Sequence, residues 1–79
     1  MNDKILEALH LAKTGKWDDA HQIAQSREGD PDFDRLHAFL HRMEGDEWNA
    51  GYWYRRCSTD VPKVSLEEEL EGLIQHYKS

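Results

Sequence analysis

The chain has 79 residues, of which 38% are hydrophobic, with a net charge of −6 and one cysteine, Cys57. This length fits a single domain with a small core, and the acidic charge argues against nonspecific nucleic-acid binding, which needs a basic surface. A lone cysteine excludes an intramolecular disulfide and favours a reducing compartment. No apolar run approaches the roughly 18 residues that span a bilayer, and Met1–Lys4 does not begin a signal peptide, so we expect a cytoplasmic protein without a membrane segment.

Apolar residues recur at helical spacing in five segments, and no segment alternates apolar and polar residues for long enough to form a strand. The pattern predicts an all-α domain over residues 1–79, with helices at 2–14, 17–27, 31–44, 47–57 and 66–77. Gly15 and Gly45 suit the left-handed residue that ends a helix. The predicted helix starts are Asn2 or Asp3, Asp30 followed by Pro31, Asp46, and Ser65 with Glu68 in a capping box.

The two halves of the chain share the pattern Gly-x4-Ala, once from Gly15 to Ala20 and once from Gly45 to Ala50. The offset between the glycines is 45 − 15 = 30 residues. In each half the glycine turns the chain between two antiparallel helices, and the alanine allows the second helix to approach the first. The sequence therefore predicts two antiparallel helical hairpins followed by one C-terminal helix.

A second pattern, Ala50-x3-Tyr54-x2-Cys57-x4-Pro62, accompanies the turn glycine in the second half, and Trp17 follows the turn glycine in the first. These residues resemble the tetratricopeptide repeat and its Sel1-like relatives, although the spacing is shorter than that family's usual value of about 34 residues. The resemblance covers residues 4–62. It implies a right-handed stack of two hairpins, with residues 65–78 as a helix that caps the exposed end.

The stretch from His37 to Arg56 has the pattern HAxLHRxEGDxxNAxYWYRR. It resembles the signature of a family of small bacterial proteins of unassigned function. The resemblance implies no activity, but it directs attention to this stretch, which contains more polar residues than a helical hairpin needs.

One candidate site lies on the predicted third helix, where Asp34, His37, His41 and Glu44 are separated by 3, 4 and 3 residues and share one face. His-x3-His on a helix can present two imidazoles to one metal ion, with Glu44 as a third ligand. The stretch lacks the glutamate that follows the first histidine in His-Glu-x-x-His. We favour the alternative of ordinary surface or inter-helix hydrogen bonding, and we predict no metal and no cofactor.

A second candidate is the stripe of Trp48, Tyr52, Arg55 and Arg56 on the predicted fourth helix. Aromatic faces beside guanidinium groups can bind an acidic or aromatic ligand. The alternative interpretation is structural: the two rings pack on the C-terminal helix while the arginines form ion pairs with the nearby acidic residues, which are Glu44, Asp46 and Glu47.

From these patterns we predict a protein-interaction or adaptor module that receives a peptide or partner helix on a concave side between the third and fourth helices. The predicted partner-binding residues are His37, His41, Glu44, Trp48, Asn49, Tyr52, Arg55 and Arg56. Two further hypotheses are a small-ligand or metal-binding domain that uses His37, His41 and Glu44, and a purely structural homo-oligomer. We expect no catalytic residues and no enzymatic activity, because Cys57 occupies an apolar helical position and no cofactor motif is present.

Overall fold

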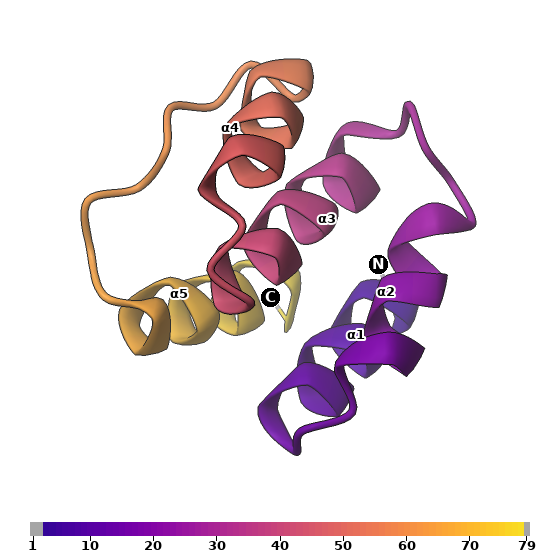
Figure 1. Cartoon of the computed structure of the whole chain (residues 1–79). Helices are drawn as coiled ribbons and strands as arrows, with labels where there is room; N and C mark the ends of the chain where they lie inside the picture. The colour runs from indigo at the N-terminus through magenta and orange to yellow at the C-terminus, as the bar shows by residue number, and fades with distance from the viewer. Residues whose placement is uncertain (1–2, 79) are drawn as a thin grey trace.

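The computed structural model describes residues 3–78, which form five helices and, within that range, no strand (Figure 1). The helices are α1 (Asp3–Lys13), α2 (Trp17–Gln25), α3 (Pro31–Met43), α4 (Glu47–Arg56) and α5 (Leu66–Lys78). The predicted all-α class is confirmed, and the helix ends inside the described range fall within two residues of the predicted ones. The predicted start at residue 2 and the candidate cap Asn2 lie outside the described residues. None of the five helices has the length and apolar character that a membrane crossing requires.

Two glycines end α1 and α3 as predicted. Gly15 and Gly45 adopt φ values of 85° and 82°, in the left-handed region that an L side chain rarely enters. In both turns the next amide bonds back to the helix: Lys16 N–H donates to the Leu11 carbonyl at 2.8 Å, and Asp46 N–H to the His41 carbonyl at 2.9 Å. The same local device therefore turns the chain once in each half of the molecule.

The predicted N-terminal caps of α3, α4 and α5 are also present. The Asp30 carboxylate accepts the Asp32 N–H at 2.9 Å, and Asp46 accepts the Asn49 N–H at 3.2 Å. Before α5, the Ser65 hydroxyl accepts the Glu68 N–H at 3.1 Å, while the Glu68 carboxylate accepts the Ser65 N–H at 3.5 Å. This reciprocal pair is a capping box, and each cap satisfies amides that have no partner within the helix.

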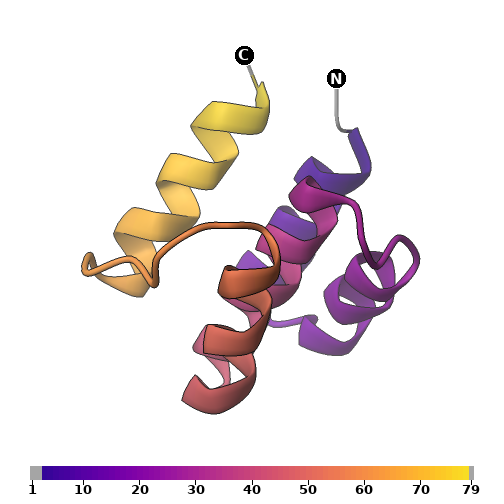
Figure 2. The same ribbon diagram turned by 90° about the horizontal axis from the view of Figure 1, so that it is seen from above.

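Consecutive helices pack against one another, α1 on α2, α2 on α3 and α3 on α4 (Figures 1 and 2). The main core lies among α1, α2, α3 and α5, and a smaller cluster of Ala38, Ala50, Trp53 and Tyr54 joins α3 to α4. This second cluster corrects one prediction. The surface between the third and fourth helices is not a concave groove for a partner, because side chains from the two helices fill it.

The C-terminal helix corrects a second prediction. α5 packs against α1 and, over a smaller area, α3, instead of covering the outer face of α4 (Figure 2). Leu73 and Ile74 carry this packing, since both are buried in the main core. A helix that contacts α1 in the first half and α3 in the second joins the two halves and does not cap the end of a stack.

A buried ion network holds α5 in place. Glu69 is 4% exposed, accepts a hydrogen bond from Arg42 Nη1 at 2.6 Å and lies 3.8 Å from Arg35 Nη2. The Tyr54 hydroxyl donates to the second Glu69 oxygen at 2.5 Å, and Arg42 also donates to the Val64 carbonyl. A buried carboxylate with several donors is satisfied. The network therefore fixes α5 and the loop before it to α3 and α4.

Candidate functional site: a histidine cluster beside an aromatic and basic helix face

Three histidines from two helices converge between α2 and α3. His37 and His41 lie one turn apart on α3, with stacked rings whose centroids are 4.9 Å apart. His21 reaches them from α2, and its Nε2 atom lies 3.0 Å from the Nε2 atom of His37. A ring nitrogen of each residue lies within 4.8 Å of a ring nitrogen of the other two. We call these three residues the histidine cluster.

Two tryptophans form the walls of the histidine cluster. The Trp17 ring stacks on His21 at 4.6 Å, and the Trp53 ring stacks on His37 at 3.9 Å, each with an interplanar angle of 15°. Trp17 is itself fixed, because its indole N–H donates to the Leu40 carbonyl at 2.7 Å. Rings packed on both sides restrict the rotation of the imidazoles, so the cluster is ordered by packing as well as by hydrogen bonding.

Burial and the neighbouring histidines lower the pKa values of His37 and His21. His37 is 3% exposed, and burial, followed by the nearby His21 and His41, lowers its pKa to about 4. Burial and the proximity of His41 also lower the pKa of His21. A protonated imidazole is disfavoured away from water and beside another cation. At neutral pH His37 is therefore a neutral imidazole with a lone pair on one ring nitrogen.

The acidic residues predicted to share this helix face have separate roles. Glu44 accepts a hydrogen bond from His41 Nδ1 at 2.6 Å, so it orients His41 from outside the cluster. The buried Asp34 accepts the Gly29 N–H at 3.0 Å and serves the turn before α3. The predicted set of His37, His41 and Glu44 is thus only partly right about which groups converge. His21 takes the place next to His37.

The stripe predicted on α4 is present at the surface. Trp48 is 74% exposed and Tyr52 is 38% exposed, and their rings stack with centroids 6.3 Å apart. The Arg56 guanidinium lies 5.9 Å from the Tyr52 centroid and 5.0 Å from the Trp53 centroid, and it donates to the Tyr52 hydroxyl at 3.3 Å. Arg55 is exposed on the next position. We call Trp48, Tyr52, Arg55 and Arg56 the α4 face.

The structural alternative for this stripe does not hold. An indole as exposed as that of Trp48 is not covered by the C-terminal helix, and α5 packs on α1 and α3. Among the described residues, no carboxylate lies within ion-pair distance of Arg55 or Arg56. The two arginines therefore keep their charges available at the surface.

Four of the predicted partner-binding residues lie outside the α4 face, and one of them, Glu44, is bonded to His41 as described above. His37 is buried and cannot contact a partner from its position against Trp53. The side chain of His41 is 12% exposed and is bonded to Glu44. The Asn49 side-chain amide donates to the Asp46 carboxylate at 2.6 Å, which reinforces the start of α4. These residues support the helices that carry the α4 face but are not part of that face.

Sequence reasoning missed His21 and the role of Trp17 in the histidine cluster. Both residues lie on α2, outside the stretch from His37 to Arg56, and they reach His37 only through the packing of α2 on α3. The sequence did contain a pattern that could have indicated their role. Trp17 and His21 are four positions apart and therefore share one helix face, next to the buried Ala20 and Ala24.

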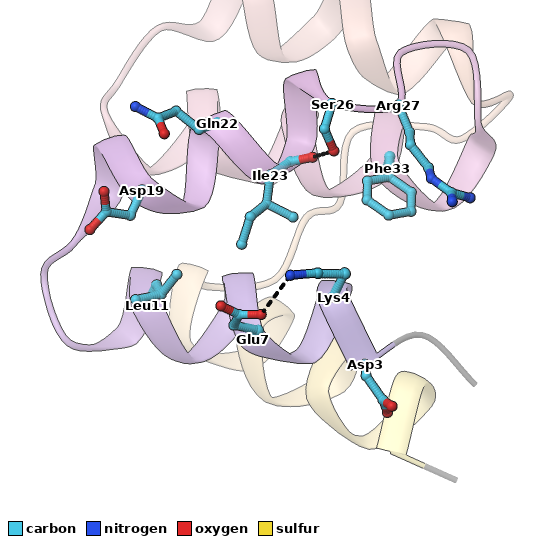
Figure 3. Close-up of a pocket in the computed structure, with 10 residues that line it drawn as sticks. All are labelled: Asp3, Lys4, Glu7, Leu11, Asp19, Gln22, Ile23, Ser26, Arg27 and Phe33. Carbon is cyan, nitrogen blue, oxygen red and sulfur yellow. Dashed lines mark hydrogen bonds and ion pairs between the residues drawn. The ribbon is translucent and has the colours of Figure 1, made fainter.

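An open depression between α1 and α2 does not form a competing site (Figure 3). Its apolar floor comes from Leu11, Ile23 and Phe33. The polar side chains around it are all exposed and of mixed charge, and Lys4 and Glu7 form an ion pair at 3.4 Å (Figure 3). Exposed side chains that neutralise one another's charges do not favour any particular class of ligand.

Comparison with known proteins adds no family or homologue: no protein-family model matches the chain, and no curated protein or solved structure matches it at a significant level.

Proposed function

We propose that this protein is an interaction module that binds an acidic segment of a partner protein through the α4 face. The observation that carries the proposal is the 74% exposure of Trp48 on a helix face that also presents two arginines without ion-pair partners among the described residues. Exposed tryptophan and arginine are the residue types most enriched where protein surfaces bind one another.

The aromatic part of the α4 face supplies contact area. Trp48 and Tyr52 stack with an interplanar angle of 9°, so together they present one extended ring surface. The Arg56 guanidinium borders this surface, held by the Tyr52 hydroxyl and by the Trp53 ring. Side chains that are ordered before binding lose less conformational entropy when a partner docks on them.

The charge distribution favours an acidic partner at this face. The chain carries a net charge of −6, so most of its surface repels acidic segments. Arg55 and Arg56 form a local exception beside exposed rings. A guanidinium group binds carboxylates in bidentate geometry, and complementary charge steers association and excludes wrong partners.

The hairpins that present this face are proposed to form a tetratricopeptide-like right-handed stack in a cytoplasmic protein without catalytic activity. Packing between each pair of successive helices from α1 to α4 supports the stack. The matching glycine turns at Gly15 and Gly45 support the repeat.

Selection from a display library of random 12-residue peptides tests the proposed function. We expect the selected peptides to be enriched in aspartate and glutamate, and to lose binding at least tenfold to the variants Trp48→Ala and Arg55→Ala/Arg56→Ala. Arg27→Ala is the matched control, because Arg27 also lies over an aromatic ring, 5.7 Å from the Phe33 centroid, but on another surface.

Two outcomes would overturn the proposal. Selection without acidic enrichment would contradict the charge argument, and selected peptides that bind the α4 variants as tightly as the wild type would place the docking surface elsewhere. Sedimentation at several protein concentrations addresses the homo-oligomer hypothesis. If the protein forms a dimer and the Trp48→Ala substitution dissociates it, the α4 face is a surface for self-association. That result would contradict its proposed role in binding acidic segments.

A further inference from the structure

We propose that the histidine cluster of His21, His37 and His41 is a binding site for one zinc ion, with an open fourth position for water. This inference concerns a second site and does not depend on the proposed binding of acidic segments by the α4 face.

The spacing of the three imidazoles suits one small cation. With bonds of about 2.0–2.1 Å, a tetrahedral zinc ion holds its ligand nitrogens about 3.3 Å apart. The Nε2 atoms of His21 and His37 lie 3.0 Å apart, and a ring nitrogen of each of the three residues lies within 4.8 Å of the other two. Binding of one ion would require the remaining nitrogens, which lie within 4.8 Å of one another, to approach to this ligand distance.

The chemistry of the donor set also points to a transition metal. Imidazole is a preferred ligand of zinc, and three histidines with one open position are a recognised zinc arrangement. A histidine that binds the metal must be a neutral imidazole, because the metal takes the lone pair of a ring nitrogen.

The surroundings of the cluster supply the outer contacts that a metal site uses. The Glu44 carboxylate accepts the N–H of His41 Nδ1 at 2.6 Å, which leaves the other His41 nitrogen, Nε2, as the electron-pair donor. Ligating histidines are oriented by such carboxylates. Trp17 and Trp53 stack on His21 and His37 and hold the rings in place without coordinating anything.

One ring nitrogen of His37 has no hydrogen-bond partner among the described residues. This atom is Nδ1, and His37 is only 3% exposed. Buried polar atoms without partners are rare in native proteins, and they cluster where function requires them. Hydrogen bonding therefore accounts for the Nε2 atom of His37, which lies 3.0 Å from His21, but not for its buried Nδ1 atom.

A zinc titration of protein freed of metal by a chelator tests the site. Competition with a colorimetric chelator should show one zinc bound per chain at micromolar protein. At a zinc concentration 100 times Kd, the Tm should rise on the order of 10 °C. Co²⁺ in place of zinc should give the intense visible absorption of a tetrahedral ion. The absence of stoichiometric zinc binding would overturn the proposal.

Variants identify the ligands. His21→Gln removes a ligand from the half-buried edge of the cluster, and it should weaken zinc binding more than 100-fold with unchanged helical content. Glu44→Gln removes only the orienting group and should weaken binding by about 10–100-fold. His10→Gln, at an exposed position on α1, should change nothing.

A competing set of ligands, His41, Glu44 and Asp46, also lies close together. Asp46→Asn distinguishes the two sets, because asparagine keeps the cap of α4 but is a poorer zinc ligand than a carboxylate. The proposal predicts that Asp46→Asn binds zinc like the wild type. Loss of binding in Asp46→Asn together with normal binding in His21→Gln would assign the metal to the competing set and overturn the proposal.

Discussion

The Nε2 atoms of His21 and His37 lie 3.0 Å apart, although the residues belong to different helices. One hydrogen can be shared between the two nitrogens only when at least one of the two rings is neutral, because two protonated imidazoles would place donors against each other. The contact thus couples the packing of α2 on α3 to the protonation state of a buried histidine.

This coupling predicts a pH-dependent stability of the metal-free protein. The folded pKa of His37, about 4, lies below the ordinary value of 6.5, so the unfolded chain binds a proton that the folded chain does not. The contribution is fully present above about pH 6.5 and is lost as the pH falls toward 4, by on the order of 3 kcal/mol. Burial acts in the same direction on the pKa of His21.

Urea unfolding of metal-free protein between pH 7 and pH 4 measures this loss. His37→Phe retains a ring against Trp53 and should flatten the decline relative to the wild type, whereas the exposed His10→Gln should leave it unchanged. A His37→Phe variant with the full wild-type decline would show that His37 does not cause it.

The buried ion network predicts a large cost for the loss of Glu69. Glu69→Ala leaves Arg42 and the Tyr54 hydroxyl without their carboxylate partner in the interior, and it should lower the free energy of unfolding by about 3–5 kcal/mol. Glu67→Ala, on the exposed first turn of α5, should stay within about 0.5 kcal/mol of the wild type. Equal effects of the two substitutions in chemical unfolding would contradict the structural role of the network.

Two glycine substitutions should change stability in opposite directions. Gly45→Ala places a side chain at φ 82° and should destabilise the protein by about 1–2 kcal/mol. Gly72→Ala lies within α5, where an added Cβ meets no atom within 4 Å, and it should stabilise the protein by about 0.5–1 kcal/mol. Thermal unfolding of both variants checks the prediction, and a stabilising Gly45→Ala would contradict the turn geometry.

Local features of the fold could be predicted from the sequence. Gly45 ends a helix, Asp30 caps one and Ser65 opens one through groups a few residues away, so each signal lies within a single turn of chain. The stripe on α4 was also predictable, since Trp48 and Tyr52 are adjacent on one helix face wherever that helix packs, but its exposure depends on the position of α5.

Features that depend on contacts between distant segments could not be predicted. The position of α5 depends on Leu73 and Ile74 entering a core built by α1, and no pattern within α5 specifies that neighbour. His21 joins His37 only because α2 packs on α3. The sequence places His37 and His41 one turn apart on the same face of α3, but it does not show that His21 from another helix lies beside them.

The central claim is that the exposed α4 face binds a partner while the buried residues beside it stabilise the fold. The most direct measurement compares Tm and acidic-peptide affinity for Trp48→Ala and Trp53→Ala. We predict that Trp48→Ala keeps the wild-type Tm within a few degrees and loses peptide binding, whereas Trp53→Ala costs about 3–5 kcal/mol of stability. A Trp48→Ala variant that unfolds as readily as Trp53→Ala, or that binds peptide like the wild type, would contradict the claim.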